Sequence, residues 1–301
     1  MRVAEGFHLD VGDGHQVWFE TQGSPEGKPA VFLHGGPGSG CNPYQHALFD
    51  PAIHYAVFVD QRGAGRSLPH GKRRANTTAH LIEDLERVRH HLQIERWLVV
   101  GGSWGATLAL AYAMAHPFCV TGIVLRATFL GTATELEWAF EVALPAFHPD
   151  LHAQLKALAP DGLSALWQRI LDPDPAIHAP AARAFGAAER AMSTLVTVPS
   201  EPNAPLPATA FMEAHYFLNN CFLAQDELMR RAPSLAGIPG IIVQARLDLL
   251  CPPITSSNLV AAWPDARLVM VEEAGHSLSH PAVFEAVRDG ITELMSDQEN
   301  P

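Results

Sequence analysis

Short apolar runs in the first third of the chain predict buried β-strands. Each run is rich in β-branched or aromatic residues and is bounded by Gly, Pro or Asp; the predicted strands are 15–20, 29–33, 55–60 and 97–100. Apolar residues at helical spacing predict a helix over 77–92, and an almost wholly apolar run predicts a buried helix over 104–116. Another buried strand begins at 123–125. This alternation favours an α/β fold with a mainly parallel sheet flanked by helices.

The strand rhythm stops at about Phe129 and resumes near Ile238. The intervening chain reads as helical or irregular, and two strand-like segments, GIIVQARLD and ARLVMV, then follow. We therefore predict one core built from residues 1–128 and 231–301. Residues 129–230 are predicted to be a helical cap, inserted after the sixth strand and lying over the carboxyl edge of the sheet.

Charge and composition exclude several functional classes. Twenty Lys and Arg against 32 Asp and Glu give a formal charge of −12, which opposes binding to nucleic acid. No apolar run reaches the ~18–20 residues that span a bilayer, so no membrane partner is expected. The cysteines form no disulfide or metal pattern, so we expect reduced thiols, a cytoplasmic location and no metal; they are Cys41, Cys119, Cys221 and Cys251.

The strongest chemical signal is Gly101-Gly102-Ser103-Trp104-Gly105, which satisfies G-x-S-x-G. This run lies where a predicted strand meets a predicted helix, which is the context that the motif requires. Glycine is needed on both sides because the serine occupies a tight turn, where a side chain would crowd the strand and the helix. Ser103 is therefore the predicted nucleophile.

A serine hydroxyl needs a histidine to accept its proton and a carboxylate to orient that histidine. Asp248 follows the strand GIIVQAR, and His276 follows the next strand, in the order Ser, Asp, His that this fold uses. Both should lie at the same sheet edge as Ser103. Two rival acids are poorly placed, since Asp226 falls in the insert and Asp265 lies near the opposite edge.

An oxyanion needs two N–H donors aimed in advance. The first predicted donor is the backbone N–H of Trp104, the residue after the nucleophile. The second comes from the loop His34-Gly35-Gly36-Pro37-Gly38, which follows an early strand. Gly36 is the preferred residue there and Gly35 the alternative.

Three segments together resemble the proline iminopeptidases, which are serine peptidases that remove N-terminal proline. They are HGGPGSG from His34, DQRGAGRS from Asp60 and GGSWGATLALAYA from Gly101. The resemblance continues in ARLDLLCPP and EEAGHS, and covers nearly all of the chain outside the insert. It implies an α/β-hydrolase fold with a helical cap, no cofactor, and the same three catalytic residues. From its own chemistry, Arg62 in DQRGAGRS is expected to brace its loop by pairing with a carboxylate.

The family resemblance also implies that glutamates of the cap bind the free amino terminus of the substrate. Glu213 in MEAHYFLNN matches the family's E-x-H-Y-F segment, whereas Glu189 matches its W-x-x-W-E segment in the glutamate alone, since Phe185 and Ala188 replace the aromatic residues. From Phe129 to Arg230 the chain has twelve Asp and Glu against five Lys and Arg. An acidic cap suits a cationic ligand.

The predicted function is therefore a serine aminopeptidase that releases proline from short peptides with a free N-terminal proline. The alternative is a carboxylesterase or amidase with the same catalytic residues and a neutral acyl pocket. A third possibility, a silent binding protein, leaves the intact nucleophile, base, acid and oxyanion loop unexplained.

Overall fold

A computed structural model describes residues 5–194 and 205–296. Its centre is an eight-stranded sheet in the order β1-β2-β4-β3-β5-β6-β7-β8. Strands β3 to β8 are mutually parallel, and β2 runs antiparallel to both of its neighbours. The strands are β1 (Glu5–Gly12), β2 (His15–Gln22), β3 (Lys28–Leu33), β4 (His54–Asp60), β5 (Trp97–Ser103), β6 (Val120–Thr128), β7 (Gly240–Ala245) and β8 (Ala266–Val271).

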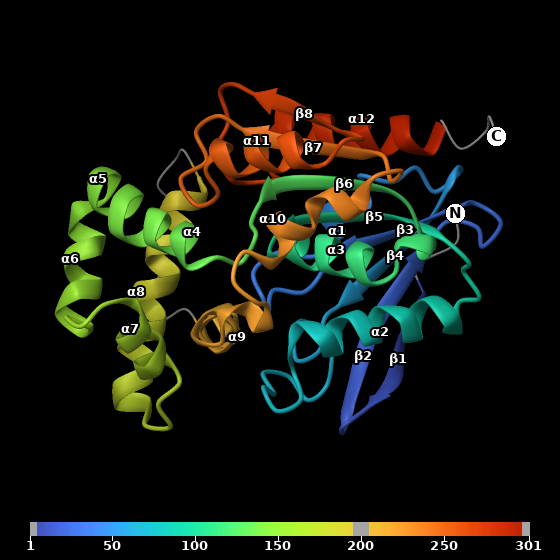
Figure 1. Ribbon diagram of the computed structural model, residues 1–301. Coiled ribbons are helices and arrows are strands. Elements are labelled where there is room, and N and C mark those ends of the chain that lie inside the picture. The colour runs from blue at the N-terminus through green and yellow to red at the C-terminus, as the bar shows by residue number, and fades with distance from the viewer. Residues whose placement is uncertain (1–4, 195–204, 297–301) are drawn as a thin grey trace.

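Helices cover both faces of this sheet (Figure 1). One face packs against α2 (Thr78–His91), α3 (Trp104–Ala115) and α11 (Pro253–Ala262). The other packs against α12 (Pro281–Ser296) and the segment around the short α1 (Pro43–His46). Thr77 caps α2 by accepting from the backbone N–H of His80, as a threonine before an amphipathic run should. All residues of α3 up to Met114 are buried, which explains its lack of a polar face.

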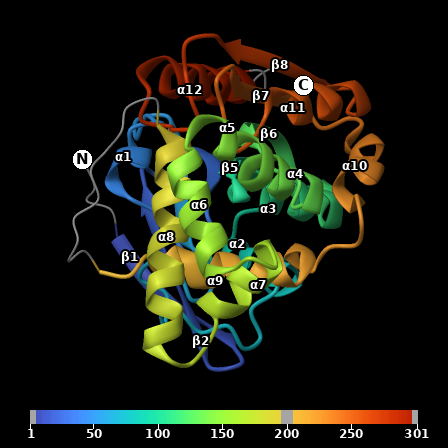
Figure 2. The same cartoon turned by 90° about the vertical axis from the view of Figure 1, so that its left-hand side faces the viewer.

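Between β6 and β7 the described chain contains helices and no strand. Figure 1 shows most of these helices beyond the edge toward which the parallel strands point, and Figure 2 shows α6 and α8 crossing in front of that edge. A π-helical segment, Trp138–Ala143, joins α4 to α5. The helices are α4 (Ala133–Glu137), α5 (Leu144–Phe147), α6 (Pro149–Leu158), α7 (Leu163–Ile170), α8 (Pro175–Ser193), α9 (Ala208–Leu218) and α10 (Glu227–Arg231). Residues 195–204 of the predicted cap lie outside the described residues.

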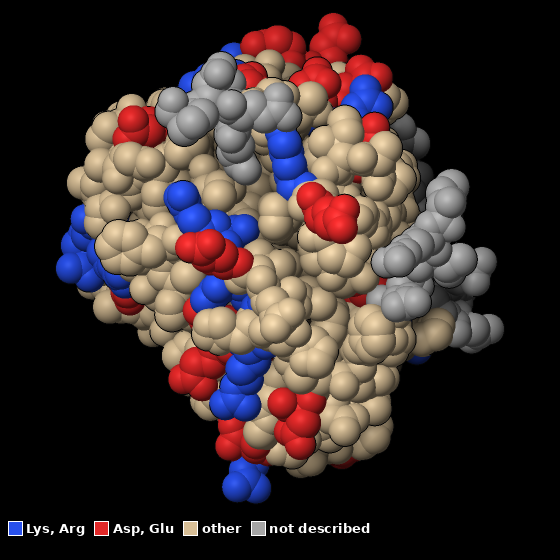
Figure 3. Space-filling model, turned by 90° about the vertical axis from the view of Figure 1, so that its right-hand side faces the viewer, with Lys and Arg blue, Asp and Glu red and all other residues tan. Residues whose placement is uncertain are grey.

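The structure confirms the predicted α/β fold, and each predicted strand and helix has a counterpart. Strand β1, at the sheet edge, was not predicted; three residues within it are exposed, so its apolar alternation is weak. The four cysteines are free thiols, as predicted. Among the described helices, none is long and apolar enough to cross a membrane. On the face turned away from the cap helices, Lys and Arg are interspersed with Asp and Glu (Figure 3).

Candidate active site

Ser103 lies at the junction of β5 and α3, in a strained backbone conformation. Its φ of 57° and ψ of −124° fall in a region that residues with a side chain rarely adopt. A Cβ on Gly101 would collide with the carbonyl oxygen of Gly105, and a Cβ on Gly105 with that of Leu33. Both flanking glycines are therefore needed for the turn that presents the Ser103 side chain at the end of the strand.

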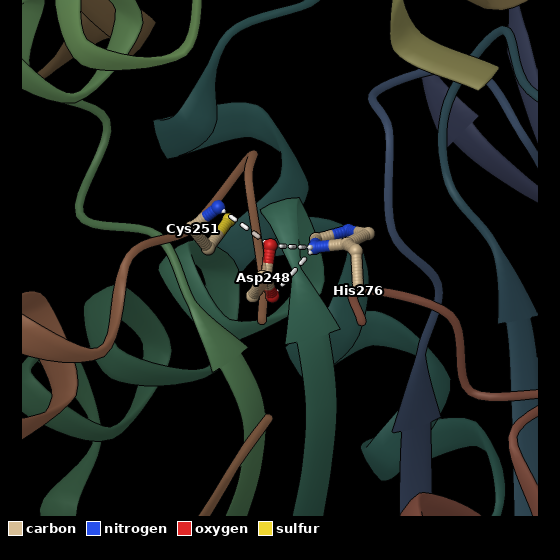
Figure 4. A group of neighbouring side chains, drawn as sticks. All are labelled: Asp248, Cys251 and His276. Atoms are coloured by element: carbon tan, nitrogen blue, oxygen red, sulfur yellow. Dashed lines mark hydrogen bonds and ion pairs between the residues drawn. The ribbon is translucent and has the colours of Figure 1, made fainter. Parts of the chain in front are cut away.

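Asp248 and His276 form a hydrogen-bonded pair at the same edge of the sheet (Figure 4). The His276 Nδ1 atom lies 2.9 Å from Asp248 Oδ2 and 3.0 Å from Oδ1. Asp248 Oδ1 also accepts from the backbone N–H groups of Leu250 and Cys251. Because an ionised carboxylate can only accept, Nδ1 carries the proton and Nε2 is left as the basic nitrogen.

Cys251 connects this pair with Ser103. Its Sγ lies within 4.8 Å of both the Asp248 carboxylate and a ring nitrogen of His276, and Cys251 lines the same cavity as Ser103. Within the described ranges, these three side chains are the one cluster of His, Cys and carboxylate close enough to bind a metal ion. Burial, however, raises the pKa of the Cys251 thiol well above its ordinary value, which opposes the thiolate that a metal requires. The cluster suits proton transfer better than metal binding.

Ser103 lines a partly open cavity of about 50 Å³. Gly36 and Trp104, the two preferred oxyanion residues, line this cavity with Ser103. Gly35 lies beside them against the nucleophile turn, where a Cβ would come within 3.0 Å of the Gly102 carbonyl oxygen. The opposite walls are apolar and include side chains from the helical insert; they are Phe129, Leu136, Ala139, Phe140 and Phe217.

Both predicted cap glutamates also line this cavity. Glu189, on α8, and Glu213, on α9, place their carboxyl groups close enough to affect each other's ionisation. Burial raises the pKa of Glu189 to about 7, and burial together with the charge of Glu189 raises the pKa of Glu213 well above its ordinary value. A Cβ built on Gly36 would lie 3.0 Å from Glu213 Oε1, so this carboxyl group adjoins the loop that is predicted to supply an oxyanion donor.

One oxygen of this acidic pair lacks a protein partner. Glu213 Oε2 is buried and, within residues 5–194 and 205–296, accepts no hydrogen bond. Glu135, a third buried carboxyl group on the cavity wall, is different, because it accepts from the backbone N–H groups of Leu130 and Thr132 and from the Thr132 hydroxyl. An unpaired buried acceptor is costly, so the Glu213 oxygen marks the place where a ligand donor would fit.

Two side chains around the site were not singled out from the sequence. Gln61 hydrogen-bonds to both His34 and Trp104, and Arg126 on β6 donates to the carbonyl oxygen of His276. The one available signal was position, since each lies at the carboxyl end of a buried strand. The bracing predicted for Arg62 is confirmed: its Nε and Nη2 donate to Asp84 at 2.8 and 2.7 Å.

Comparison with known proteins agrees with this geometry. The sequence pattern of the family described as alpha/beta hydrolase fold matches residues 28–282. A probable proline iminopeptidase of Streptomyces coelicolor is 45% identical, over 89% of this chain and 88% of its own. A probable proline iminopeptidase of Leptolyngbya boryana is 38% identical, over 97% and 94%. Among solved structures, a proline iminopeptidase-related protein of Thermus thermophilus superposes with a TM-score of 0.65 at 26% identity, covering 98% of each chain.

The full-length matches confirm the resemblance that the three sequence segments indicated. They cover the helical insert as well as the sheet, so the similarity is not confined to the motifs around Ser103. The chain belongs to the proline iminopeptidase family of α/β-hydrolase-fold enzymes.

Proposed function

We propose that this enzyme is a serine aminopeptidase that releases proline from the amino terminus of short peptides. The observation that carries the proposal is the pair of carboxyl groups from the buried Glu213 and the half-buried Glu189, in the cavity that Ser103 lines. A cationic imino group bound there would donate to the unpartnered Glu213 oxygen and balance the acidic charge. The apolar walls would hold the pyrrolidine ring, with the first peptide carbonyl at Ser103.

In the proposed mechanism, His276 Nε2 takes the proton of the Ser103 hydroxyl as its oxygen attacks the prolyl carbonyl carbon. Asp248 keeps the proton of His276 on Nδ1 and stabilises the imidazolium that forms. The backbone N–H groups of Gly36 and Trp104 stabilise the oxyanion. His276 then gives its proton to the departing peptide amine, which leaves a prolyl ester on Ser103.

Water completes the proposed cycle. His276 deprotonates a water molecule that attacks the prolyl ester, the oxyanion forms again at the same N–H groups, and the Ser103 oxygen recovers a proton from His276. Proline leaves with its carboxylate free. Because the acidic pair would occupy the position of any preceding residue, one residue fits before the bond that breaks, which defines an aminopeptidase.

The proposal extends to the organisation of the chain. We assign residues 1–128 and 231–301 to the catalytic core and 129–230 to a cap that carries amine recognition. The free cysteines support a cytoplasmic location, and the net charge of −12 supports a small peptide rather than a nucleic acid as the partner.

The apolar walls keep one alternative open, a carboxylesterase or amidase that takes a neutral acyl group. Four substrates separate the two functions: the arylamides of proline, alanine and N-acetylproline, and a short acyl ester. We expect rapid release from the proline arylamide and a near-complete loss when its nitrogen is acetylated. Cleavage of the ester and the acetylated amide, without the free proline amide, would establish the alternative.

A further inference from the structure

We propose that Gln61 is the positioning residue of the oxyanion hole, holding the segments that carry both of its N–H donors in fixed relation. The inference rests on the proposed acyl-transfer chemistry at Gly36 and Trp104. It does not depend on proline being the substrate.

Gln61 follows the last residue of β4 and is 4% exposed. Its side chain makes two hydrogen bonds to the two halves of the oxyanion hole. The Oε1 atom accepts from Trp104 Nε1 at 2.7 Å, and Nε2 donates to the carbonyl oxygen of His34 at 3.0 Å. Its backbone N–H donates to His34 Nε2, also at 3.0 Å. Three bonds from one residue thus join the oxyanion loop to the first residue of α3.

The bond to His34 reaches the Gly36 donor through one planar peptide. His34 Nε2 accepts from Gln61, so the imidazole proton is on Nδ1, which donates to the carbonyl oxygen of Gly35 at 2.9 Å. Burial lowers the pKa of His34 and keeps this ring neutral. In a trans peptide the Gly35 C=O and the Gly36 N–H point in opposite directions. Fixing the carbonyl therefore fixes the direction of the N–H that would meet the oxyanion.

The bond to Trp104 holds the second donor. The indole is 1% exposed and packs edge-on to Tyr216, with ring centroids 4.6 Å apart. Its backbone N–H is the other predicted donor, at the start of α3. An indole that is held at Nε1 by Gln61 and packed against Tyr216 resists rotation of the Trp104 side chain.

Gln61 is itself held at both ends. Asp60 accepts from the backbone N–H and the Nε of Arg66, both at 2.8 Å, while Arg62 pairs with Asp84. The flanking residues therefore cannot shift without breaking the buried Arg62–Asp84 pair or the bonds of Arg66 to the buried Asp60 carboxylate. A glutamine that merely satisfied its own polar groups would need no such anchoring, and its bonds would not converge on the two donor segments.

The test uses an alkyl fluorophosphonate, which phosphonylates a serine nucleophile with loss of fluoride and charges the same oxyanion hole without requiring proline. We expect Gln61→Leu to slow phosphonylation about 10- to 100-fold, since loss of an aligned oxyanion donor costs about 10²–10³-fold. The kcat for the proline arylamide should fall in parallel, with KM nearly unchanged, because the bound ground state does not use these donors. Trp104→Phe, which removes the indole N–H together with part of the ring, should slow both reactions as well.

The matched control is Gln22→Leu. Gln22 donates to the carbonyl oxygens of His46 and Phe49 and pairs with the opposite end of β4. Its variant should keep wild-type rates, even where its melting temperature falls as far as that of Gln61→Leu. In the double variant Gln61→Leu/Trp104→Phe the two losses should overlap instead of multiplying.

Rates for Gln61→Leu that match those of Gln22→Leu would overturn the proposal, and so would losses that multiply in the double variant. If Gln61→Leu fails to fold, Trp104→Phe decides alone, and a wild-type phosphonylation rate then rejects the proposal. A wild-type enzyme that reacts with the fluorophosphonate but ignores the proline arylamide would refute the proposed substrate, while the test of Gln61 stands.

Discussion

Asp84 in the core and Glu213 in the helical insert both carry buried carboxyl groups, but the charges of their neighbours differ. Asp84 faces the guanidinium of Arg62, which donates to both of its oxygens, and the two residues are 1% and 2% exposed. Glu213 instead faces the carboxyl group of Glu189 and keeps one oxygen without a hydrogen bond from the described chain. The first arrangement is complete within the protein, and the second lacks a cation.

This difference separates the two tasks of the enzyme. Polar groups of the core, including Asp248 and His276, are paired within the protein, so the proposed catalytic geometry would be fixed before a substrate arrives. In the proposed function, the acidic pair would lower the stability of the free enzyme and would favour substrates whose free amino terminus supplies a cation. An acid removed from the core should therefore destabilise the enzyme, whereas one removed from the pair should stabilise it.

The largest expected effect tests whether the reaction depends on the core while amine binding depends on the insert. Ser103→Ala should lower kcat for the proline arylamide by about 10⁴- to 10⁶-fold, as loss of a serine nucleophile does elsewhere. Prolinamide should still bind with wild-type affinity, because the proposed amine site belongs to the insert. Steady-state kinetics and calorimetric titration measure the two quantities. Loss of prolinamide binding together with turnover would contradict the assignment of the reaction to the core and of amine binding to the insert.

The next effect concerns the paired acid of the core. Asp84→Asn should lower the free energy of unfolding by about 3 kcal/mol, because it leaves the buried Arg62 guanidinium without its main counter-charge. Urea denaturation at pH 7 measures this change. A loss under about 0.5 kcal/mol would mean that the remaining bond of Arg62 to the Ala75 carbonyl oxygen, together with Asp13, is sufficient.

On the side of the insert, Glu213→Gln should reduce kcat/KM for the proline arylamide about 10- to 100-fold, since a hydrogen bond to an ionised group contributes about 1.5–3 kcal/mol. Hydrolysis of a short acyl ester without an amino group should be unchanged. Glu137→Gln, an exposed position on α4, is the matched control and should leave both substrates unaffected. An equal loss of kcat/KM for the amide and the ester would show that Glu213 does not recognise the amine.

The smallest effect is the pH dependence of stability. Burial raises the pKa of Glu189 from 4.5 to about 7, so its stabilising proton is fully present below pH 4.5 and is lost as the pH rises through about 7. Glu189→Gln should therefore reduce the decline in unfolding free energy between pH 5 and pH 8 by on the order of 1–2 kcal/mol. Denaturation curves across this range give the slope, and Glu137→Gln should keep that of the wild type. A steeper decline in Glu189→Gln would reverse the assigned sign.

The core could be predicted from the sequence because its signals are local. The spacing of apolar residues predicted the strands and helices, and the G-x-S-x-G run at the end of a strand predicted a nucleophile turn. Residues that follow successive parallel strands meet at one sheet edge, which is how Asp248 and His276 were chosen, and they lie within hydrogen-bonding distance.

Contacts that depend on packing could not be predicted in the same way. Glu189 comes from a segment in which Phe185 and Ala188 replace the aromatic residues of the family pattern, yet α8 and α9 bring it to Glu213. Phe185 still packs inside the insert, stacked on Phe140 with ring centroids 5.1 Å apart. Gln61 hydrogen-bonds to His34 and Trp104, which lie 27 and 43 positions away in the sequence. The spacing of apolar residues does not predict contacts between residues so far apart.

Proton release on binding tests most directly whether the acidic pair recognises a cationic amino group. Calorimetric titration of Ser103→Ala with prolinamide at pH 6, in buffers of different ionisation enthalpy, counts the protons that leave. We predict release of about one proton per ligand, because a bound cation should ionise the pair, in which burial raises the pKa of Glu189 to about 7 and that of Glu213 well above its ordinary value. Binding without proton release, or with the same release after both Glu189→Gln and Glu213→Gln, would contradict the account.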